Sequence, residues 1–418
     1  MKEPFIDDPS LQVILKDIPT PFYLYDERGI RTAVRRLRSA FAWNPGFREY
    51  YAVKAAPTPG ILQILKEEGC GCDCATETEL LLAERCGFGS EDIVFSSNDT
   101  PASAYRKALE TGAYINLDDI SHIDMLDEIV DEWPKTVLLR YNPGGIFALG
   151  ESKEGFQVMD TPEESKFGMT EAQIHAAVEA LQKRGVECFG LHAFLASNTL
   201  SDEYYPVLAE KLFELAVRMH IKHGCPIPCI DLSGGIGIPY RPEQRENNIE
   251  AIGEGVRRAY EKILVPAGLT DTAIWTELGR YITGPHGALI TRVIHRKETY
   301  RTYIGTDSGS QDLLRPAMYG AYHHITVMGK EKDPCDGLYD VTGSLCENND
   351  KLAVQRPLPS PAVGDVLFIH DAGAHGHSMG FQYNGQLRCA EYLYCCDGSV
   401  RLLRRRETPD DLFATLVW

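Results

Sequence analysis

Eight short runs of β-forming residues follow one another between residues 49 and 279, and stretches with helical periodicity separate several of them. Parallel strands need a helix or another long crossover between them, so this alternation predicts a parallel sheet covered by helices. Eight repeats over about 250 residues predict a closed (β/α)8 barrel. The alternative is an open doubly wound sheet, but the glycine-rich fingerprint that follows the first strand of such sheets is missing. The expected strands cover residues 49–54, 72–76, 92–96, 114–117, 136–142, 188–194, 229–235 and 273–279, and the clearest helices cover residues 77–86 and 171–184.

The pattern of predicted elements changes after residue 285. Strand-like runs are joined there by turns that contain glycine and proline, with little helical periodicity, which predicts a mostly antiparallel β domain. The opening run TPFYLYD, residues 20–26, is a candidate for the same domain. We therefore expect a barrel over residues 25–285 and a β domain built from residues 1–24 and 286–418. The later runs are ALITRVIHR, TYIGTDS, HHITVM, VLFIHD and EYLYCCD.

The chain carries a formal net charge of −18, with acidic residues spread along its length. A surface of this sign repels nucleic-acid phosphates and anionic lipids. The amino terminus has no apolar run typical of a secretory signal, and no segment has the apolar length needed to cross a bilayer. We therefore expect a cytoplasmic protein with a small-molecule substrate, and neither nucleic acid nor membrane as a partner.

Metal binding is disfavoured by the spacing of the usual ligands. The 12 cysteines include no CxxC pair, and buried free thiols are the expected state in a reducing compartment. Alternation along a strand would place three of the cysteines on one face: Cys70, Cys72 and Cys74. A metal cluster at three closely spaced histidines is an interpretation that we do not adopt: His370, His375 and His377.

Lys54 ends the first expected strand, in the run EYYAVK. The carboxyl ends of barrel strands form the face at which the active sites of such barrels lie. A lysine among tyrosines and valine is costly to bury as a cation, so desolvation would lower its pKa and make it a nucleophile able to form a Schiff base. The alternative is a lysine whose ammonium group reaches solvent, and position alone leaves both interpretations open.

The segment YAVKA resembles the cofactor-binding segment of the fold-type III decarboxylases of basic amino acids, which depend on pyridoxal phosphate. In that family the lysine forms a Schiff base with the cofactor, which implies this role for Lys54. Companion motifs follow in the family's order over nearly the whole chain: TPFYLYD, GCDCATETEL, DLSGGIGIPY, ELGRYITGP, RPAMYGAY, CENND and GAHGHSMGFQYN. The resemblance implies an alanine-racemase-type barrel with a β domain, and pyridoxal 5'-phosphate as cofactor.

The resemblance also implies cofactor contacts at the ends of several strands. Glu277 matches the carboxylate that pairs with the pyridine nitrogen and keeps it protonated, which makes the ring an effective electron sink. Gly234 and Gly235 lack a Cβ, so their N–H groups can approach a phosphate closely, although an ordinary turn would look the same. The remaining cofactor contacts that the resemblance implies are Asp73, Phe194, Ser197, Gly279, Arg280, His375 and Tyr383.

Some positions depart from the family's pattern. Phe194 stands where relatives stack a histidine on the cofactor ring, and phenylalanine can stack but offers no N–H and no charge. Ser233 replaces a glycine, which implies a slightly less open loop. His375 replaces a tyrosine that contacts the phosphate, and a histidine can keep a hydrogen bond with a different reach. His192 is expected to line the barrel as a structural residue, with a direct contact to the cofactor as the alternative.

Substrate contacts and the acid catalyst come from the second half of the chain by the same resemblance. Cys346 lies in the segment CENND, which in relatives reaches the partner's active site in a two-fold dimer, and its thiol is placed to protonate the carbanion left after CO2 departs. Arg315 can bind a distal carboxylate in a bidentate manner, and Glu347 can bind a distal ammonium group. These two groups form the far half of meso-diaminopimelate. The implied substrate contacts are Arg280, Arg315, Tyr319, Glu347 and Tyr383.

The expected function is therefore the pyridoxal-phosphate-dependent decarboxylation of meso-diaminopimelate to L-lysine by a homodimer with shared active sites. One alternative is a decarboxylase of ornithine, lysine or a related amine precursor, including one specific for D-amino acids. A second is an amino-acid racemase on the same barrel, although alanine racemases pair the pyridine nitrogen with arginine, whereas this chain has Glu277. A non-catalytic cofactor carrier of the single-barrel type would lack the β domain and the CENND segment.

Overall fold

The computed structural model describes residues 2–144 and 162–418. The chain divides into two compact units, each described by itself. The barrel unit consists of Arg31–Ile238 and Glu246–Tyr281, and the β unit consists of Met1–Ile30, Pro239–Arg245 and Ile282–Trp418.

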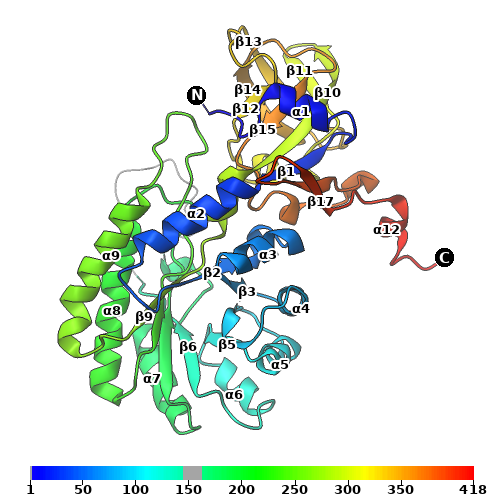
Figure 1. Ribbon diagram of the computed structural model, residues 1–418. Coiled ribbons are helices and arrows are strands. Elements are labelled where there is room, and N and C mark those ends of the chain that lie inside the picture. Colours follow the sequence, from blue (N-terminus) through cyan, green and yellow to red (C-terminus); the bar gives the residue numbers. More distant parts are fainter. Residues whose placement is uncertain (1, 145–161) are drawn as a thin grey trace. The chain divides into compact units, whose positions relative to one another are not determined.

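The barrel unit contains eight parallel strands that pair in sequence order, and the first strand pairs with the last to close the barrel (Figure 1). The expected fold class is therefore confirmed. Most observed strands are shorter than the expected runs, because several runs turn into loops at their carboxyl ends, whereas the run over residues 114–117 has the expected bounds. The strands are β2 (Arg48–Ala52), β3 (Gly71–Cys74), β4 (Ile93–Ser96), β5 (Tyr114–Leu117), β6 (Thr136–Arg140), β7 (Cys188–His192), β8 (Cys229–Asp231) and β9 (Ala273–Thr276).

Helices connect successive barrel strands and cover their outer face (Figure 1); one further helix precedes the first strand and a short one follows the last. The two expected helices are confirmed as α4 and α7; Thr170 and Gln173 form a reciprocal capping box at the start of α7. Gly224 ends α8 in the left-handed conformation that favours glycine at this position. The helices are α2 (Glu27–Ala40), α3 (Pro59–Glu67), α4 (Glu77–Arg85), α5 (Ala102–Thr111), α6 (His122–Asp127), α7 (Glu171–Gln182), α8 (Tyr204–His223), α9 (Ile249–Ile263) and α10 (Gly279–Thr283).

A layer of side chains fills the interior of the barrel. Four members of this layer come from alternate strands, as expected for a packed (β/α)8 core, and Trp275 of β9 packs against them. A ligand therefore has to bind above this layer, at the carboxyl ends of the strands. The four are Tyr50 of β2, Val94 of β4, Leu138 of β6 and Cys229 of β8.

The β unit is a mixed, mostly antiparallel sheet with the order β14-β13-β11-β10-β1-β16-β17, and β15 pairs with both β10 and β12. Parallel pairing is found between β1 and β16 and between β11 and β13. The six expected runs correspond to β1, β10, β11, β12, β15 and β16, whereas β13, β14 and β17 were not predicted. The bounds are β1 (Phe22–Asp26), β10 (Gly287–Glu298), β11 (Thr302–Thr306), β12 (Ile325–Val327), β13 (Gly337–Thr342), β14 (Lys351–Leu358), β15 (Val366–Ile369), β16 (Ala390–Tyr394) and β17 (Val400–Arg404).

Three short helices complete the β unit: α1 (Asp8–Ile14), α11 (Arg315–Tyr319) and α12 (Pro409–Phe413). Its core packs Leu11 of α1 against Phe22, Ile290 and Phe368 of the sheet. Among the described residues, no helix is long and apolar enough to span a membrane. The cysteines are free thiols, and no group of histidines, cysteines and acids in the described part of the chain has the arrangement of a metal site.

Candidate active site

Lys54 lies just beyond the first barrel strand, in a 3-10 turn over Val53–Ala55, and not inside the strand as the sequence suggested. Its Nζ atom is 3.0 Å from Oδ2 of Asp73, which lies in β3, and about half of the lysine side chain (51%) is exposed at the mouth of the barrel. Although burial favours the neutral amine, the negative charges of Asp73 and Glu277 raise the pKa of Lys54. The prediction from the sequence had the opposite direction and is wrong, because desolvation alone would lower the pKa of Lys54 and the two carboxylates reverse the shift.

Glu277 follows β9 directly and is buried, with a side-chain exposure of 4%. Its Oε2 atom accepts a hydrogen bond from the Ser233 hydroxyl at 2.6 Å and lies 3.3 Å from Nε2 of His192. Its Oε1 atom accepts from the Ser96 hydroxyl at 3.2 Å. Burial raises the pKa of Glu277, but His192, Lys54 and Ser233 act against burial and lower it to about 2. The carboxylate is therefore ionised at neutral pH.

His192 ends β7 and is almost fully buried. Burial lowers its pKa, and Glu277 only partly opposes this effect. We therefore assign a neutral ring that donates from Nε2 to Glu277, while its buried Nδ1 atom has no hydrogen-bond partner among the described residues. His192, expected from the sequence to be a structural residue, thus contacts the predicted site residue Glu277.

The other acids around the barrel mouth are held closer to the neutral form. Burial and the Glu277 charge raise the pKa of Asp73 to about 7, although Lys54 opposes them. Burial also raises the pKa of Glu49 and Asp231 well above the usual range. Glu277 is therefore the acid of this group whose negative charge persists across the physiological pH range.

The turn after β8 brings Ser233, Gly234 and Gly235 against the carboxyl ends of the neighbouring strands. A Cβ on Gly234 would lie 3.0 Å from the Glu277 carbonyl oxygen, and a Cβ on Gly235 would lie 2.6 Å from the Tyr204 ring. Gly235 also has a φ of +123°, which side chains with a Cβ rarely adopt. The close approach of the backbone at this turn therefore requires glycine at both positions.

Four further predicted residues lie at the same end of the barrel. Phe194 follows β7, and one of its ring carbons would be 3.8 Å from a Cβ on Gly234. The Arg280 guanidinium donates to the Ser197 hydroxyl at 3.4 Å. A Cβ on Gly279 would lie 2.6 Å from the Ala55 side chain, so the start of α10 packs on the turn that carries Lys54. The structure thus brings together Lys54, Asp73, Phe194, Ser197, Gly234, Gly235, Glu277, Gly279 and Arg280.

Sequence reasoning missed the polar residues that end the middle strands. Asn116 of β5 donates to Ser96 at 3.0 Å, and Ser96 donates to Glu277. Arg140 ends β6, is buried, and pairs with Asp118 at 3.1 Å. The available signal was a polar residue at or just after the carboxyl end of each predicted strand, which is where barrel sites are built.

In the β unit, Arg315 and Tyr319 lie on α11. Arg315 is buried, its guanidinium lies 4.7 Å from the centre of the Tyr240 ring, and its Nη1 atom donates to Nε2 of His323 at 3.0 Å. The carbonyl of His370 can only accept, so Nδ1 of His323 donates to it at 2.9 Å and leaves Nε2 as the acceptor for Arg315. Tyr319 is partly exposed, at 39%.

The CENND segment forms the loop between β13 and β14. Asp350 is buried and fixes this loop, because its carboxylate accepts from the backbone N–H groups of Ser310 and Leu345 at 2.7 and 2.8 Å. Cys346 and Glu347 are exposed. The hydrogen bonds of Asp350 therefore fix the base of the loop, on which Cys346 and Glu347 are exposed.

Tyr383 lies in a 3-10 turn, Tyr383–Gly385, and is 54% exposed. The side chain of Asn384 in this turn accepts from the Cys346 N–H at 2.7 Å, which ties the turn to the CENND loop. His375 is half-buried with a φ of +55°. The neighbouring histidines have separate partners, since His370 contacts Thr326 and His377 contacts Glu391, so the three do not form a cluster.

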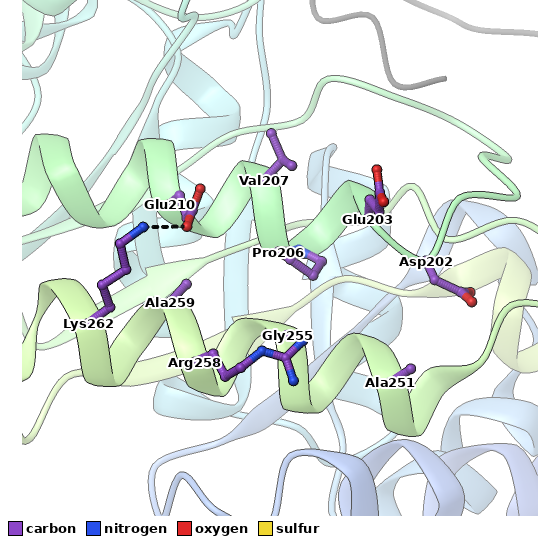
Figure 2. A pocket seen from close by; sticks show the side chains of 10 residues that line it. All are labelled: Asp202, Glu203, Pro206, Val207, Glu210, Ala251, Gly255, Arg258, Ala259 and Lys262. Atoms are coloured by element: carbon purple, nitrogen blue, oxygen red, sulfur yellow. Dashed lines mark hydrogen bonds and ion pairs between the residues drawn. The ribbon is translucent and has the colours of Figure 1, made fainter. Parts of the chain in front are cut away.

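A separate groove of about 430 Å³ lies between α8 and α9 (Figure 2). Figure 2 shows charged side chains along it, with Lys262 paired to Glu210 at 3.2 Å. None of its lining residues is a predicted site residue. They are Asp202, Glu203, Pro206, Val207, Glu210, Ala251, Gly255, Arg258, Ala259 and Lys262.

The sequence of this chain is similar to those of a known protein family and of individual known proteins. The family described as "Pyridoxal-dependent decarboxylase, pyridoxal binding domain" matches residues 27–284. Protein TabA of Pseudomonas amygdali pv. tabaci is 42% identical over 98% of this chain and 94% of its own length. Diaminopimelate decarboxylase of Methanothermobacter thermautotrophicus is 37% identical over 94% of this chain and 90% of its own length.

Solved structures agree with the sequence relatives. The crystal structure of diaminopimelate decarboxylase from Helicobacter pylori complexed with L-lysine has a TM-score of 0.87 and 26% identity, and the match covers 97% of this chain and 98% of that one. Diaminopimelate decarboxylase from M. jannaschii has a TM-score of 0.87 and 27% identity, with 97% and 94% covered.

Proposed function

Because the chain belongs to the pyridoxal-dependent decarboxylases, we propose that the barrel mouth around Lys54 and Glu277 is its active site and that it converts meso-diaminopimelate to L-lysine. The protein is a carboxy-lyase with pyridoxal phosphate as cofactor. The observation that carries the proposed site is the ionised Glu277 carboxylate beside a half-exposed Lys54 at the catalytic face of the barrel.

The residues present fit pyridoxal phosphate. An ionised carboxylate offers about four positions for hydrogen-bond donors, and Glu277 uses three of them within the described part of the chain, for Ser233, His192 and Ser96. One position remains for the N–H of a protonated pyridine ring. The buried Oδ1 atom of Asp73 has no hydrogen-bond partner among the described residues, which also suits a site that a polar ligand completes.

Each chain residue then has a defined task. When bound, pyridoxal phosphate supplies an electron sink for the electron pair left at Cα as CO2 departs. Lys54 would hold the cofactor covalently, Glu277 would keep the proton on the pyridine nitrogen, and Phe194 would pack on the ring. Asp73 would keep Lys54 oriented. The remaining contacts, chiefly to the phosphate, would come from Ser197, Gly234, Gly235, Gly279, Arg280, His375 and Tyr383.

The substrate assignment rests on the relatives and on the chemistry of the β unit. Several diaminopimelate decarboxylases are 30–37% identical to this chain over more than nine-tenths of its length. Arg315 would bind the distal carboxylate of the substrate and Glu347 its distal ammonium group, with further contacts from Arg280, Tyr319 and Tyr383. The exposed thiol of Cys346 would donate the proton that replaces CO2 at Cα.

We also propose a homodimer in which the CENND loop of one chain serves the cofactor of its partner. The exposed positions of Cys346, Glu347 and Tyr383 in the single chain support this arrangement, because residues that touch substrate are expected to be shielded from water in the working enzyme. A cytoplasmic location stays a prediction.

The experiment that tests the proposed function measures CO2 release from meso-diaminopimelate, D- and L-lysine, and D- and L-ornithine in parallel. We expect the highest kcat/KM with meso-diaminopimelate and L-lysine as the product. A preference for ornithine or lysine would contradict the substrate assignment. Loss of substrate chirality without CO2 release would contradict the reaction itself and favour a racemase.

A further inference from the structure

Ser233 adopts a backbone conformation that is unusual for a residue with a side chain. Its φ is +55°, in the left-handed region that glycine adopts easily and serine does not. It lies in the turn after β8, directly before Gly234 and Gly235, and is only 2% exposed. Strained residues of this kind persist where the surrounding structure holds them in place, and they are frequent at functional sites.

Three hydrogen bonds hold the backbone of Ser233 in this conformation. Its N–H donates to Oδ1 of Asp231 at 2.7 Å, and its carbonyl oxygen accepts from the Tyr205 hydroxyl and, at 2.9 Å, from the Glu277 N–H. A glycine could make all three of these backbone contacts without strain. They therefore do not explain why this position carries a side chain.

Within residues 2–144 and 162–418, the Ser233 side chain makes one hydrogen bond, and its acceptor is the buried Glu277 carboxylate. The hydroxyl donates to Oε2 of Glu277 at 2.6 Å, which is the shortest of the three contacts to that side chain. The other two are longer, at 3.3 Å from His192 and 3.2 Å from Ser96. A short hydrogen bond to an ionised acceptor is a strong one, and in a buried site it also fixes the direction of the carboxylate.

We propose that Ser233 is a positioning residue, whose hydroxyl holds the Glu277 carboxylate in place as the charged partner of the cofactor's pyridine nitrogen. This inference rests on the proposed function, since it needs Glu277 to face that nitrogen. On this proposal the hydrogen bond from the Ser233 hydroxyl to Glu277 is the reason why this strained position carries a serine and not a glycine. Removing the hydroxyl should weaken cofactor binding through the pyridine nitrogen and leave the fold intact.

The test compares two variants of Ser233 with a matched control. Ser233→Ala removes the hydroxyl and keeps the strain, and Ser233→Gly removes both. Ser90 is the control, because it is also a non-glycine residue with positive φ (+47°) in the barrel unit, but it is exposed. Each purified chain, freed of cofactor, is titrated with pyridoxal phosphate and with its 1-deaza analogue, in which carbon replaces the pyridine nitrogen. Thermal midpoints of the cofactor-free and the loaded proteins are measured beside the titrations.

We expect both Ser233 variants to bind pyridoxal phosphate about tenfold more weakly, the change that follows when one of several hydrogen bonds to a charged group is lost. Both should bind the deaza analogue as wild type does. The cofactor-free Ser233→Gly chain should melt no lower than wild type, and Ser90→Gly should leave both affinities unchanged.

Two results would overturn the inference. One is unchanged affinity for pyridoxal phosphate in Ser233→Ala and Ser233→Gly, and the other is an equal loss for both ligands, which would mean that Ser233 only packs the turn. Failure of the proposed site gives a different pattern: wild type itself would bind the two ligands equally, because Glu277 would not face the pyridine nitrogen.

Discussion

At the scale of single residues, the barrel mouth concentrates one permanent negative charge among several acids. Glu277 is ionised because His192, Lys54 and Ser233 outweigh the cost of its burial. For Asp73, Glu49 and Asp231 the cost of burial outweighs their hydrogen bonds and, for Asp73, the charge of Lys54, so their pKa values are raised. A single fixed charge gives a protonated pyridine ring one defined orientation. The arrangement therefore favours chemistry that needs a strong electron sink.

Arg315 provides the first prediction at this scale. Arg315→Ala should lower kcat/KM for meso-diaminopimelate by the equivalent of about 2–5 kcal/mol, because a charge-assisted contact is lost and the substrate carboxylate is left unpaired. Cofactor absorbance should not change. The matched control is Arg241→Ala, which removes an exposed guanidinium that lies 4.6 Å from the Tyr322 ring in the same unit. Equal kinetics in both variants would exclude Arg315 from substrate binding.

His370 provides a prediction about pH. Burial, followed by nearby His324, Lys2 and His323, lowers the pKa of His370 to about 2. The unfolded histidine takes up a proton near pH 6.5 and the folded one does not, so the stability that the neutral ring contributes is present above pH 6.5 and is lost as the pH falls toward 2. The loss is about 1.4 kcal/mol per pH unit, or about 2 kcal/mol at pH 5.

Denaturant unfolding of wild type and His370→Gln at pH 7.5 and pH 5 tests this point. The stability advantage of wild type over the variant should shrink by about 2 kcal/mol at the lower pH. If the two proteins lose stability in parallel between these pH values, His370 titrates normally in the folded state and the prediction is wrong.

At the scale of elements, Asp350 fixes the loop between β13 and β14. Asp350→Ala would leave the N–H groups of Ser310 and Leu345 without their acceptor, at a cost of about 1–3 kcal/mol for each buried group. We expect a lower thermal midpoint and faster proteolysis within the CENND segment. Asp350→Asn keeps one acceptor and should lie between. Asp336→Ala, which removes an exposed acid just before β13, is the control and should match wild type in both measurements.

Helices and strands could be predicted where the local sequence pattern of apolar residues was strong. The eight barrel strands and helices α4 and α7 follow from apolar runs and helical periodicity that need no distant partner. Strands β13, β14 and β17 were missed because polar residues, glycine or proline interrupt them. Asp340 of β13 is an example. An acid inside a short run does not indicate a strand, but this acid is buried in the sheet and accepts hydrogen bonds from Gln355 and Arg301, which lie outside β13. Such partners become visible only when the sheet is assembled.

The same limit applies to the site. The motifs pointed to Lys54 and Glu277, and the structure brings both to one end of the barrel. The donors to Glu277 were not predicted, since Ser96 and Ser233 are ordinary residues until strand order places them beside it. The same holds for Asn116, which donates to Ser96. The direction of the Lys54 pKa was wrong for the same reason, because two carboxylates from other strands outweigh burial.

At the scale of the whole molecule, the account predicts an active site built from two subunits. Mixing the inactive variants Lys54→Ala and Cys346→Ala, with subunit exchange, should restore activity, because one site in each mixed dimer contains both wild-type residues. The other site carries both defects. With random mixing about half of the dimers are mixed, so roughly a quarter of wild-type activity should return. No recovery, despite demonstrated exchange, would mean that Cys346 serves its own chain or has no part in the chemistry.

The central claim, that Lys54 carries the cofactor at the mouth of the barrel, has a direct test. Borohydride reduction of the loaded protein should fix the pyridoxyl group on Lys54 and block trypsin there, so that the labelled peptide spans residues 49–66. Lys54→Arg should remain unlabelled while folding normally. A reduced pyridoxyl group on any other lysine of the wild-type chain, with Lys54 unmodified, would contradict the account.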